Sequence, residues 1–361
     1  MYRRRVKKPP VPVFPETLEE MGYIINERSQ IIDSSGKQYT FDLKAKNRDY
    51  QEAHSRALAD VTVRSAVARM EKELGLVEAK VPFEIEKDDT TTPHANILMS
   101  PDVKQCKRLL VLVPGTKETV GSWSRRILTK FSVEEGSMFY TAKRARAEGY
   151  GIVMLNPNAQ YWVNDQATIH TPITRAFEII PSLRTPEEHA DYVLRHLIQS
   201  CASKEIYFIA HKYGAEILIQ AIHAQFDFFR DRVAGIALVE GTYSIHCFPD
   251  LAFRSWWSKN AAGYIPSEED EIKNKVEYRD ATGCNCVVVN TKEYDYTIME
   301  VMPDIFRFFN TRKNRDNSFN SYKDAIRPLN EDDPTTAMVA IHVDQNGEDG
   351  GSWDESTTAT K

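Results

Sequence analysis

The sequence predicts an α/β protein in which a mostly parallel sheet carries helices on both faces. Two observations support this fold. Five short runs are almost entirely apolar, which is typical of strands that are buried on both faces. These runs lie at 109–113, 151–155, 206–210, 233–239 and 286–289. Segments with the apolar spacing of helices lie between them, and this alternation is typical of a parallel sheet that is covered on both sides.

The first predicted helix is the longest and runs from Asp49 to Leu74. Its apolar side chains recur at helical spacing, and Gly75 is a suitable C-terminal cap. Four further helices are expected between and after the strands. They cover 138–148, 186–200 with Thr185 as the N-cap, 214–225 and 303–310.

Composition divides the chain into a structured middle and two polar ends. Residues 1–13 are basic and rich in proline, while residues 312–361 are polar and acidic, and both compositions are typical of disorder. No linker-like stretch and no internal repeat interrupts the middle. We therefore predict a disordered basic segment at 1–13, a helical extension at 14–80, one domain at 81–311 and a disordered acidic tail at 312–361.

Length, charge and cysteine content exclude several classes of protein. The chain has 361 residues and a formal net charge of −6, so it lacks the positive field of a general nucleic-acid binder. No apolar run approaches the roughly 20 residues that a membrane-spanning helix needs. The basic start lacks the apolar part of a secretory signal, and five cysteines are few for a disulfide-stabilised fold. We expect an intracellular protein with reduced thiols and no membrane contact.

Motifs for nucleotides and metals are also missing. The segment PGTKETVGSW after the first apolar run does not match a phosphate-binding loop, and no G-x-G-x-x-G occurs. Cys284 and Cys286 lack a second ligand pair at zinc spacing, and His189 and His196 are seven residues apart on one predicted helix. We therefore predict no cofactor and no metal.

The third apolar run leads directly into a helix through Ala210-His211-Lys212-Tyr213-Gly214, which we call the elbow. Small residues at 210, 214 and 215 suit a nucleophile elbow, in which a sharp turn raises one side chain above the sheet. Lys212 stands where such a turn carries its hydroxyl nucleophile. A lysine amine is protonated near neutral pH and is a nucleophile only after it loses that proton. Two interpretations remain: Lys212 is a remnant at a former active site, or it is a cation for a bound anion.

Six segments occur in the same order as in a known family. They are FPETLEEMGY (14–23), LLVLVPG (109–115), EGYGIVMLNPN (148–158), TPEEHADYV (185–193), YFIAHKYGA (207–215) and PDIFRFF (303–309). Over residues 14–310 the chain resembles the Arb-two domain family, whose animal branch, family with sequence similarity 172, comprises cotranscriptional regulators. The resemblance implies an α/β-hydrolase-like fold and a role in the nucleus, with the cytoplasm as the alternative location. It also implies small-RNA-linked heterochromatin formation and splicing regulation, with Argonaute-containing or chromatin assemblies as partners.

The resemblance also assigns the positions of a catalytic triad. Animal relatives have A-H-S-Y-G-G at the elbow, and Lys212 matches the serine. The acid falls at Glu240, and the histidine falls at Tyr294 in NTKEYDYT. The oxyanion loop falls at Pro114 and Gly115, where hydrolases have a histidine before the glycine. Because triad replacements remove the general-base route, we predict a pseudoenzyme with no catalytic residue.

The alternative is a residual or altered esterase or amidase whose nucleophile the sequence does not reveal. Its cleft residues would include Lys212, Glu240 and Cys247. A pairing of Cys247 with His246 is disfavoured, because adjacent residues of an extended segment point to opposite faces. His211, next to the apex, is the other imidazole near the elbow.

Trp256 and Trp257 follow the fourth apolar run. The first interpretation is that they pack a lid over the edge of the sheet. The alternative is a partner surface, because exposed tryptophans often anchor interfaces.

A basic cluster near the start has three interpretations: a nuclear-localisation signal, an RNA contact or a solvated disordered segment. It consists of Arg3, Arg4, Arg5, Lys7 and Lys8.

Deletion of residues 1–8 tests the RNA contact. If these side chains bind RNA, the full chain binds with a steep salt dependence, because each phosphate contact releases counterions, and the deletion removes that binding. Fluorescence anisotropy of a labelled RNA at several salt concentrations measures both effects. Undetectable binding by the full chain at low salt would contradict the contact.

Overall fold

The structure is a computed structural model. It describes residues 12–42, 46–170, 176–241, 243, 248, 250–267, 276–279, 282–291 and 294–313. The basic cluster at 3–8 and nearly all of the acidic tail lie outside these residues, as do His246 and Cys247.

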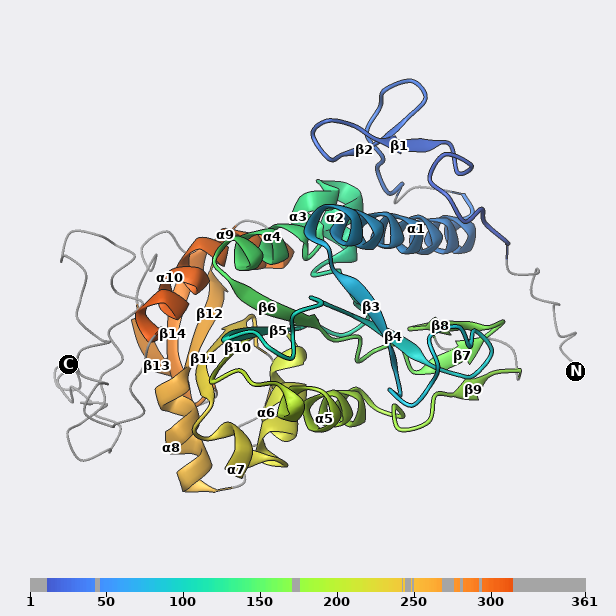
Figure 1. Cartoon of the computed structure of the whole chain (residues 1–361). Helices are drawn as coiled ribbons and strands as arrows, with labels where there is room; N and C mark the ends of the chain where they lie inside the picture. Colours follow the sequence, from blue (N-terminus) through green and yellow to red (C-terminus); the bar gives the residue numbers. More distant parts are fainter. Residues whose placement is uncertain are drawn as a thin grey trace, which may run out of the picture.

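In the described part of the chain, the main sheet has nine strands in the order β13-β14-β12-β11-β10-β5-β6-β4-β3 (Figure 1). They are β3 (Val77–Val81), β4 (Ala95–Met99), β5 (Arg108–Val113), β6 (Tyr150–Met154), β10 (Glu205–His211), β11 (Val233–Val239), β12 (Ala261–Ser267), β13 (Val276–Arg279) and β14 (Cys284–Asn290). The strands from β6 across to β14 run parallel, whereas β4 is antiparallel to both of its neighbours and β13 is antiparallel to β14.

Helices cover both faces of this sheet, as Figure 1 shows. One layer holds α1 (Arg48–Leu74), α2 (Arg125–Lys130), α3 (Val133–Gly136), α4 (Phe139–Ala147), α9 (Thr297–Glu300) and α10 (Met302–Arg312). The other holds α5 (Pro186–His196), the short turn η1 (Ile198–Ser200), α6 (Gly214–His223), α7 (Phe226–Phe229) and α8 (Leu251–Asn260). Each layer has its own apolar cluster against the sheet. The predicted α/β fold, a mostly parallel sheet with helices on both faces, is confirmed.

The predicted strands and helices are confirmed with small shifts at their ends. The run at 233–239 is β11 without change, and the other four runs form the cores of β5, β6, β10 and β14. The hydroxyl of Thr185 caps α5 by accepting from the backbone N–H of Glu188 at 3.2 Å. Gly75 ends α1 with a φ of 65°, the left-handed conformation that favours glycine at this position.

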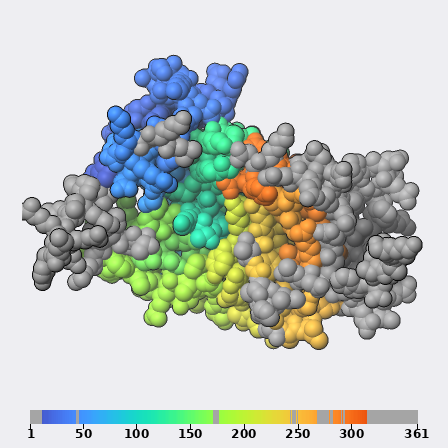
Figure 2. Space-filling model, turned by 180° about the vertical axis from the view of Figure 1, so that it is seen from behind, coloured from blue at the N-terminus to red at the C-terminus, as the bar shows by residue number. Residues whose placement is uncertain are grey.

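Several elements had no clear signal in the sequence. β1 (Tyr23–Ile25) and β2 (Ile31–Asp33) form a hairpin, and β7 (Tyr161–Val163), β8 (Gln166–Thr168) and β9 (Glu178–Ile179) form a small separate sheet. The strands of these two sheets have two or three residues each, too few for periodicity to appear. Figure 2 shows the N-terminal part, in blue, projecting from the body of the molecule.

The N-terminal region and the main domain are joined through α1 and β3. Leu58 and Met70 of α1 are fully buried in the same apolar cluster as Phe309 of α10. The boundary that we predicted between residues 80 and 81 falls within β3, which pairs with β4 along its full length. We therefore expect α1 and the sheet to unfold together.

Leu58→Ala tests this unit. Removing a fully buried leucine leaves a cavity, and we expect the free energy of unfolding to fall by about 2–5 kcal/mol in one transition. Urea denaturation followed by both circular dichroism and tryptophan fluorescence measures it. Glu71→Ala, on the exposed side of the same helix, is the matched control and should change little. Two separate transitions would show that α1 is an independent extension.

Candidate functional site

The turn between β10 and α6 has the geometry of a strand–turn–helix elbow. β10 ends at His211 and α6 begins at Gly214. Lys212 at the apex has a φ of 50°, in the left-handed region that non-glycine residues rarely adopt. Its backbone N–H donates to the carbonyl of Val239 at 2.9 Å, and its carbonyl accepts from the N–H of Ala215 at 3.1 Å. These two hydrogen bonds hold a strained residue at the apex.

Two glycines allow the strand ends to approach the elbow. A Cβ at position 214 would lie 2.7 Å from the carbonyl oxygen of Val113 and 2.9 Å from that of Pro114. A Cβ at position 115 would lie 3.2 Å from the carbonyl oxygen of His211 and 3.3 Å from the Cβ of Lys212. A side chain at 214 would therefore clash with the end of β5, and the Pro114–Gly115 loop packs directly against the elbow.

The Pro114–Gly115 loop is positioned by an asparagine from the next strand end. The amide of Asn158, which follows β6, donates at 2.8 Å to the carbonyl oxygens of both Gly115 and Glu118. Pro114 has no backbone N–H. An oxyanion hole works through N–H groups aimed at the reacting oxygen, so a proline here removes one donor from the loop.

The side chain of Lys212 ends between two carboxylates. Its Nζ lies 2.5 Å from Oδ1 of Asp295 and 3.8 Å from Oε2 of Glu240. Arg126 of α2 also pairs with Asp295. The lysine side chain is 35% exposed, so its charge is partly shielded from water. The ammonium group at the apex is therefore already engaged by residues of the chain itself.

The two neighbouring cations, Lys212 and Arg126, affect the pKa of the Asp295 carboxyl. Partial burial alone would raise the pKa of its carboxyl, but hydrogen bonds and charges from Lys212 and Arg126 outweigh that effect and hold the pKa below its ordinary value. The carboxyl is thus ionised at neutral pH and provides a counter-charge for both cations.

Glu240 and His211 lie beneath the apex. Glu240 follows β11, and its backbone N–H donates to the carbonyl of Tyr264 at 2.9 Å. Its Oε1 lies 3.6 Å from Nε2 of His211, whose side chain is 1% exposed. Neither ring nitrogen of His211 has a hydrogen-bond partner within the described chain. The imidazole is therefore a buried group at the end of β10, next to Glu240.

Glu118 is a partly buried acid near the same histidine. Burial raises the pKa of its carboxyl, although the hydroxyl of Ser122 donates to it at 2.6 Å and the backbone N–H of Arg125 also donates. Glu118 lies in the strand exit PGTKETVGSW, which carries no metal or phosphate motif. Sequence reasoning missed both Glu118 and Asp295, because nothing in their local pattern indicates that they converge on the elbow.

The structure brings Lys212 and Glu240 together, but Tyr294 is not the residue that reaches them. Tyr294 begins the turn η4 (Tyr294–Tyr296), and its side chain is 47% exposed. The next residue, Asp295, contacts Lys212 instead. The loop predicted to supply a histidine position thus supplies a carboxylate.

Comparison with known families identifies the family of this chain. The family model for the Arb2 domain matches residues 14–271, a range that includes α1, the elbow and Glu240. The chain belongs to the Arb2 domain family. The human cotranscriptional regulator ARB2A is 25% identical to it over 345 residues, which cover 84% of this chain and 82% of the human protein.

Solved structures similar to this Arb2 chain have low sequence identity. The histone deacetylase Clr3 is 13% identical with a TM-score of 0.39, and the match covers 75% of this chain and 45% of that chain. The esterase Est22 is 11% identical with a TM-score of 0.40, and the match covers 75% of this chain and 89% of that chain.

The two tryptophans of the Arb2 chain have different environments. Trp257 is fully buried and packs near Phe248 and Phe253, so the alternative that it forms part of a partner surface was wrong. Trp256 is partly exposed, and its Nε1 donates to the carbonyl of Arg230 at 2.9 Å. Adjacent residues of a helix lie about 100° apart, so these two rings face in different directions.

Within the described part of the Arb2 chain, no group of three or more histidine, cysteine or acidic side chains is placed to hold a metal. Burial lowers the pKa of His189 to about 3, and its Nε2 accepts from the backbone N–H of Asn156 at 3.1 Å. His196 stacks on Tyr192 with ring centroids 4.3 Å apart. These histidines are therefore packing residues. None of the described helices is long and apolar enough to cross a membrane.

Asp295→Asn tests the charge arrangement at the elbow. Because the pKa of Asp295 is lowered in the folded chain, its contribution to stability is present above the ordinary carboxyl range and is lost as pH falls through the folded pKa. We expect wild type to be more stable than the variant at pH 7, with the difference shrinking below about pH 4. Thermal or urea unfolding at several pH values measures it, with Asp88→Asn at an exposed position as control. A difference that stays constant down to pH 2 would contradict the ion pair.

Proposed function

We propose that this Arb2 chain is a non-catalytic protein with a hydrolase-like fold that acts in the nucleus as a cotranscriptional regulator. In this proposal it takes part in small-RNA-linked heterochromatin formation and in splicing, and its partners are Argonaute-containing or chromatin assemblies. Membership of the Arb2 family and the name of the human relative, cotranscriptional regulator ARB2A, support the regulatory part. The observation that carries the non-catalytic part is the ammonium group of Lys212 between two carboxylates.

Acyl transfer at an elbow needs a nucleophile and a base within hydrogen-bond reach of each other. Lys212 presents an ammonium group instead of a hydroxyl, and that group is paired with Asp295 and lies near Glu240. The ring of His211 is buried, and its Nε2 lies 3.6 Å from Oε1 of Glu240. The sequence from residue 290 to 313, which includes the loop expected to supply the base, contains no histidine.

The positions of the two cations near the apex, Lys212 and Arg126, also disfavour hydrolysis. A developing oxyanion is stabilised by donors and positive charge that are free to face it. Here the charges of both Lys212 and Arg126 are directed at Asp295. An incoming carbonyl would have to compete with a carboxylate that is fixed in place. A fold of this kind is suited to presenting a stable surface to partners.

Serine-hydrolase chemistry is tested directly on the purified full chain. We expect no labelling by a fluorophosphonate probe and no turnover of p-nitrophenyl esters, because the apex lacks a hydroxyl and an accessible base. Lys212→Ser, which restores the hydroxyl alone, should also stay unlabelled, because no imidazole activates it. A known serine hydrolase run in parallel verifies the probe.

The same variants address the regulatory part. We expect the tagged full chain and Lys212→Ala to co-purify with an Argonaute protein from nuclear extract to the same extent. Many turnovers by the wild type, lost in Lys212→Ala or Glu240→Gln, would overturn the non-catalytic proposal. Absence of the tagged chain from nuclei would overturn the nuclear one.

A further inference from the structure

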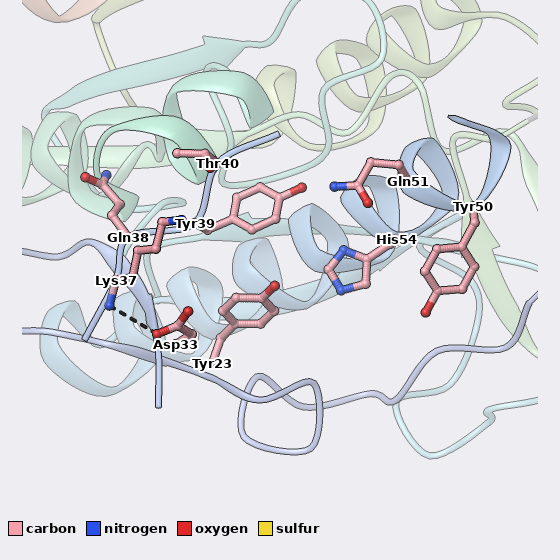
Figure 3. A pocket seen from close by; sticks show the side chains of 9 residues that line it. All are labelled: Tyr23, Asp33, Lys37, Gln38, Tyr39, Thr40, Tyr50, Gln51 and His54. Atoms are coloured by element: carbon pink, nitrogen blue, oxygen red, sulfur yellow. Dashed lines mark hydrogen bonds between the residues drawn. The ribbon is translucent and has the colours of Figure 1, made fainter. Parts of the chain in front are cut away.

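The β1–β2 hairpin and the start of α1 enclose a pocket of about 330 Å³ that belongs to none of the features above (Figure 3). Four of its lining side chains are rings: Tyr23 from the hairpin, Tyr39 from the segment that follows it, and Tyr50 and His54 from α1. Asp33 lines the same pocket. We call this the hairpin pocket. Its volume lies in the range of small-ligand sites.

Three of the rings surround one space. The centroids of Tyr23 and Tyr39 are 5.7 Å apart with planes at 90°, and His54 lies 6.0 Å from Tyr23 and 6.2 Å from Tyr39. In Figure 3 these three rings lie together, with Tyr50 on the far side of His54, 6.3 Å from it between centroids. Rings at several different angles around one space are the geometry that binds a cation through its π faces.

The faces of these rings are not used by cations of the described chain. Elsewhere, guanidinium groups lie over aromatic rings, as Arg69 does over Phe139 at 3.9 Å and Arg232 over Phe228 at 4.3 Å. No described lysine or arginine lies over Tyr23, Tyr39 or Tyr50 in this way. Among the described residues, Lys37 lines the hairpin pocket, but no lysine or arginine covers the faces of its tyrosine rings.

One acidic and one basic side chain, Asp33 and Lys37, line the pocket, and the surrounding segment is acidic. Asp33 is held ionised by hydrogen bonds: its carboxylate accepts from the hydroxyl of Ser35 and from the backbone N–H of Lys37, and the pKa of the carboxyl is lowered. Burial lowers the pKa of His54, so that ring is neutral at pH 7 and does not repel a cation. Residues 14–54 together contain eight acidic and five basic side chains.

We propose that the hairpin pocket binds a methylated ammonium group. Methyl groups spread the positive charge over an apolar surface, so such a cation loses little hydration on entering a cage of rings. An unmethylated ammonium or a metal ion is strongly hydrated and gains less there. The charge can come from a free choline-like molecule or from a trimethylated lysine on a peptide, and both present the same group to the rings.

Isothermal titration calorimetry of the full chain with choline tests the proposal. The control ligand is 3,3-dimethylbutan-1-ol, which has the same shape without the charge. We expect choline to bind and the alcohol to bind at least about tenfold more weakly. Equal binding of the two, or no binding of either choline or a trimethyllysine peptide, would overturn the proposal.

Two peptides, identical except that one lysine is trimethylated in the first and unmodified in the second, test whether the natural ligand is a protein or a small molecule. A trimethyllysine peptide that binds more tightly than choline, while its unmodified form does not, places the natural ligand on a protein. Choline binding at least as tight as that of the peptide places it on a small molecule. Both results support recognition of the methylated ammonium group.

Three variants assign the binding to the rings. Tyr23→Phe keeps the π face and should bind choline nearly as well as wild type, whereas Tyr23→Leu keeps apolar bulk only and should bind about tenfold more weakly. Tyr140→Leu, at an exposed tyrosine of α4 outside the pocket, is the control and should bind normally. Circular dichroism of each variant verifies the fold. Normal binding by a folded Tyr23→Leu would contradict the role of the cage.

Discussion

The ion pair between Lys212 and Asp295 is the interaction on which the strand ends depend. It joins the apex of the elbow to η4, 83 residues later, and Arg126 adds a third element, α2. Glu240 is only 11% exposed and lies 3.8 Å from the same ammonium. Without Lys212, Asp295 would keep its contact with Arg126, but both carboxylates would lose the ammonium group that lies between them. The lysine at the apex therefore has a structural role that a serine would not fill.

The strained backbone of the apex is possible because neighbouring strands fix it on every side. A left-handed non-glycine residue costs on the order of 1–3 kcal/mol and persists only where the surroundings determine it. Here the backbone N–H of Lys212 donates to the carbonyl of Val239 in β11, and the end of β5 packs against Gly214. Asn158 ties the loop after β5 to the end of β6. The backbone geometry of the elbow is thus held by the neighbouring strands, and the ion pair of Lys212 adds a link from the apex to η4.

Local sequence patterns predicted much of the fold, but they did not predict which side chains from distant loops meet at the elbow. The apolar runs predicted the central strands, because burial on both faces leaves little choice of residue. Small residues at 210 and 214 predicted the elbow. Asp295 was missed by one position, because which side chain of a short turn points inward depends on the path of η4 and not on local pattern. The alternative of a partner surface failed for Trp257 for a related reason: neighbouring residues on α8 diverge by about 100°, so Trp257 is buried while Trp256 is partly exposed.

The elbow and the hairpin pocket rest on one pair of packed helices. Asp60 of α1, six residues after His54 of the pocket, pairs with Arg125 of α2 at 2.6 Å, and the next residue, Arg126, pairs with Asp295. Spatial continuity of this kind is not in itself a route for a signal. It does mean that both sites depend on the packing of α1 against α2. The cations at the elbow are paired with carboxylates, whereas no described lysine or arginine lies over the tyrosine rings of the pocket. We therefore place the capacity to bind a further cation at the hairpin and not at the strand ends.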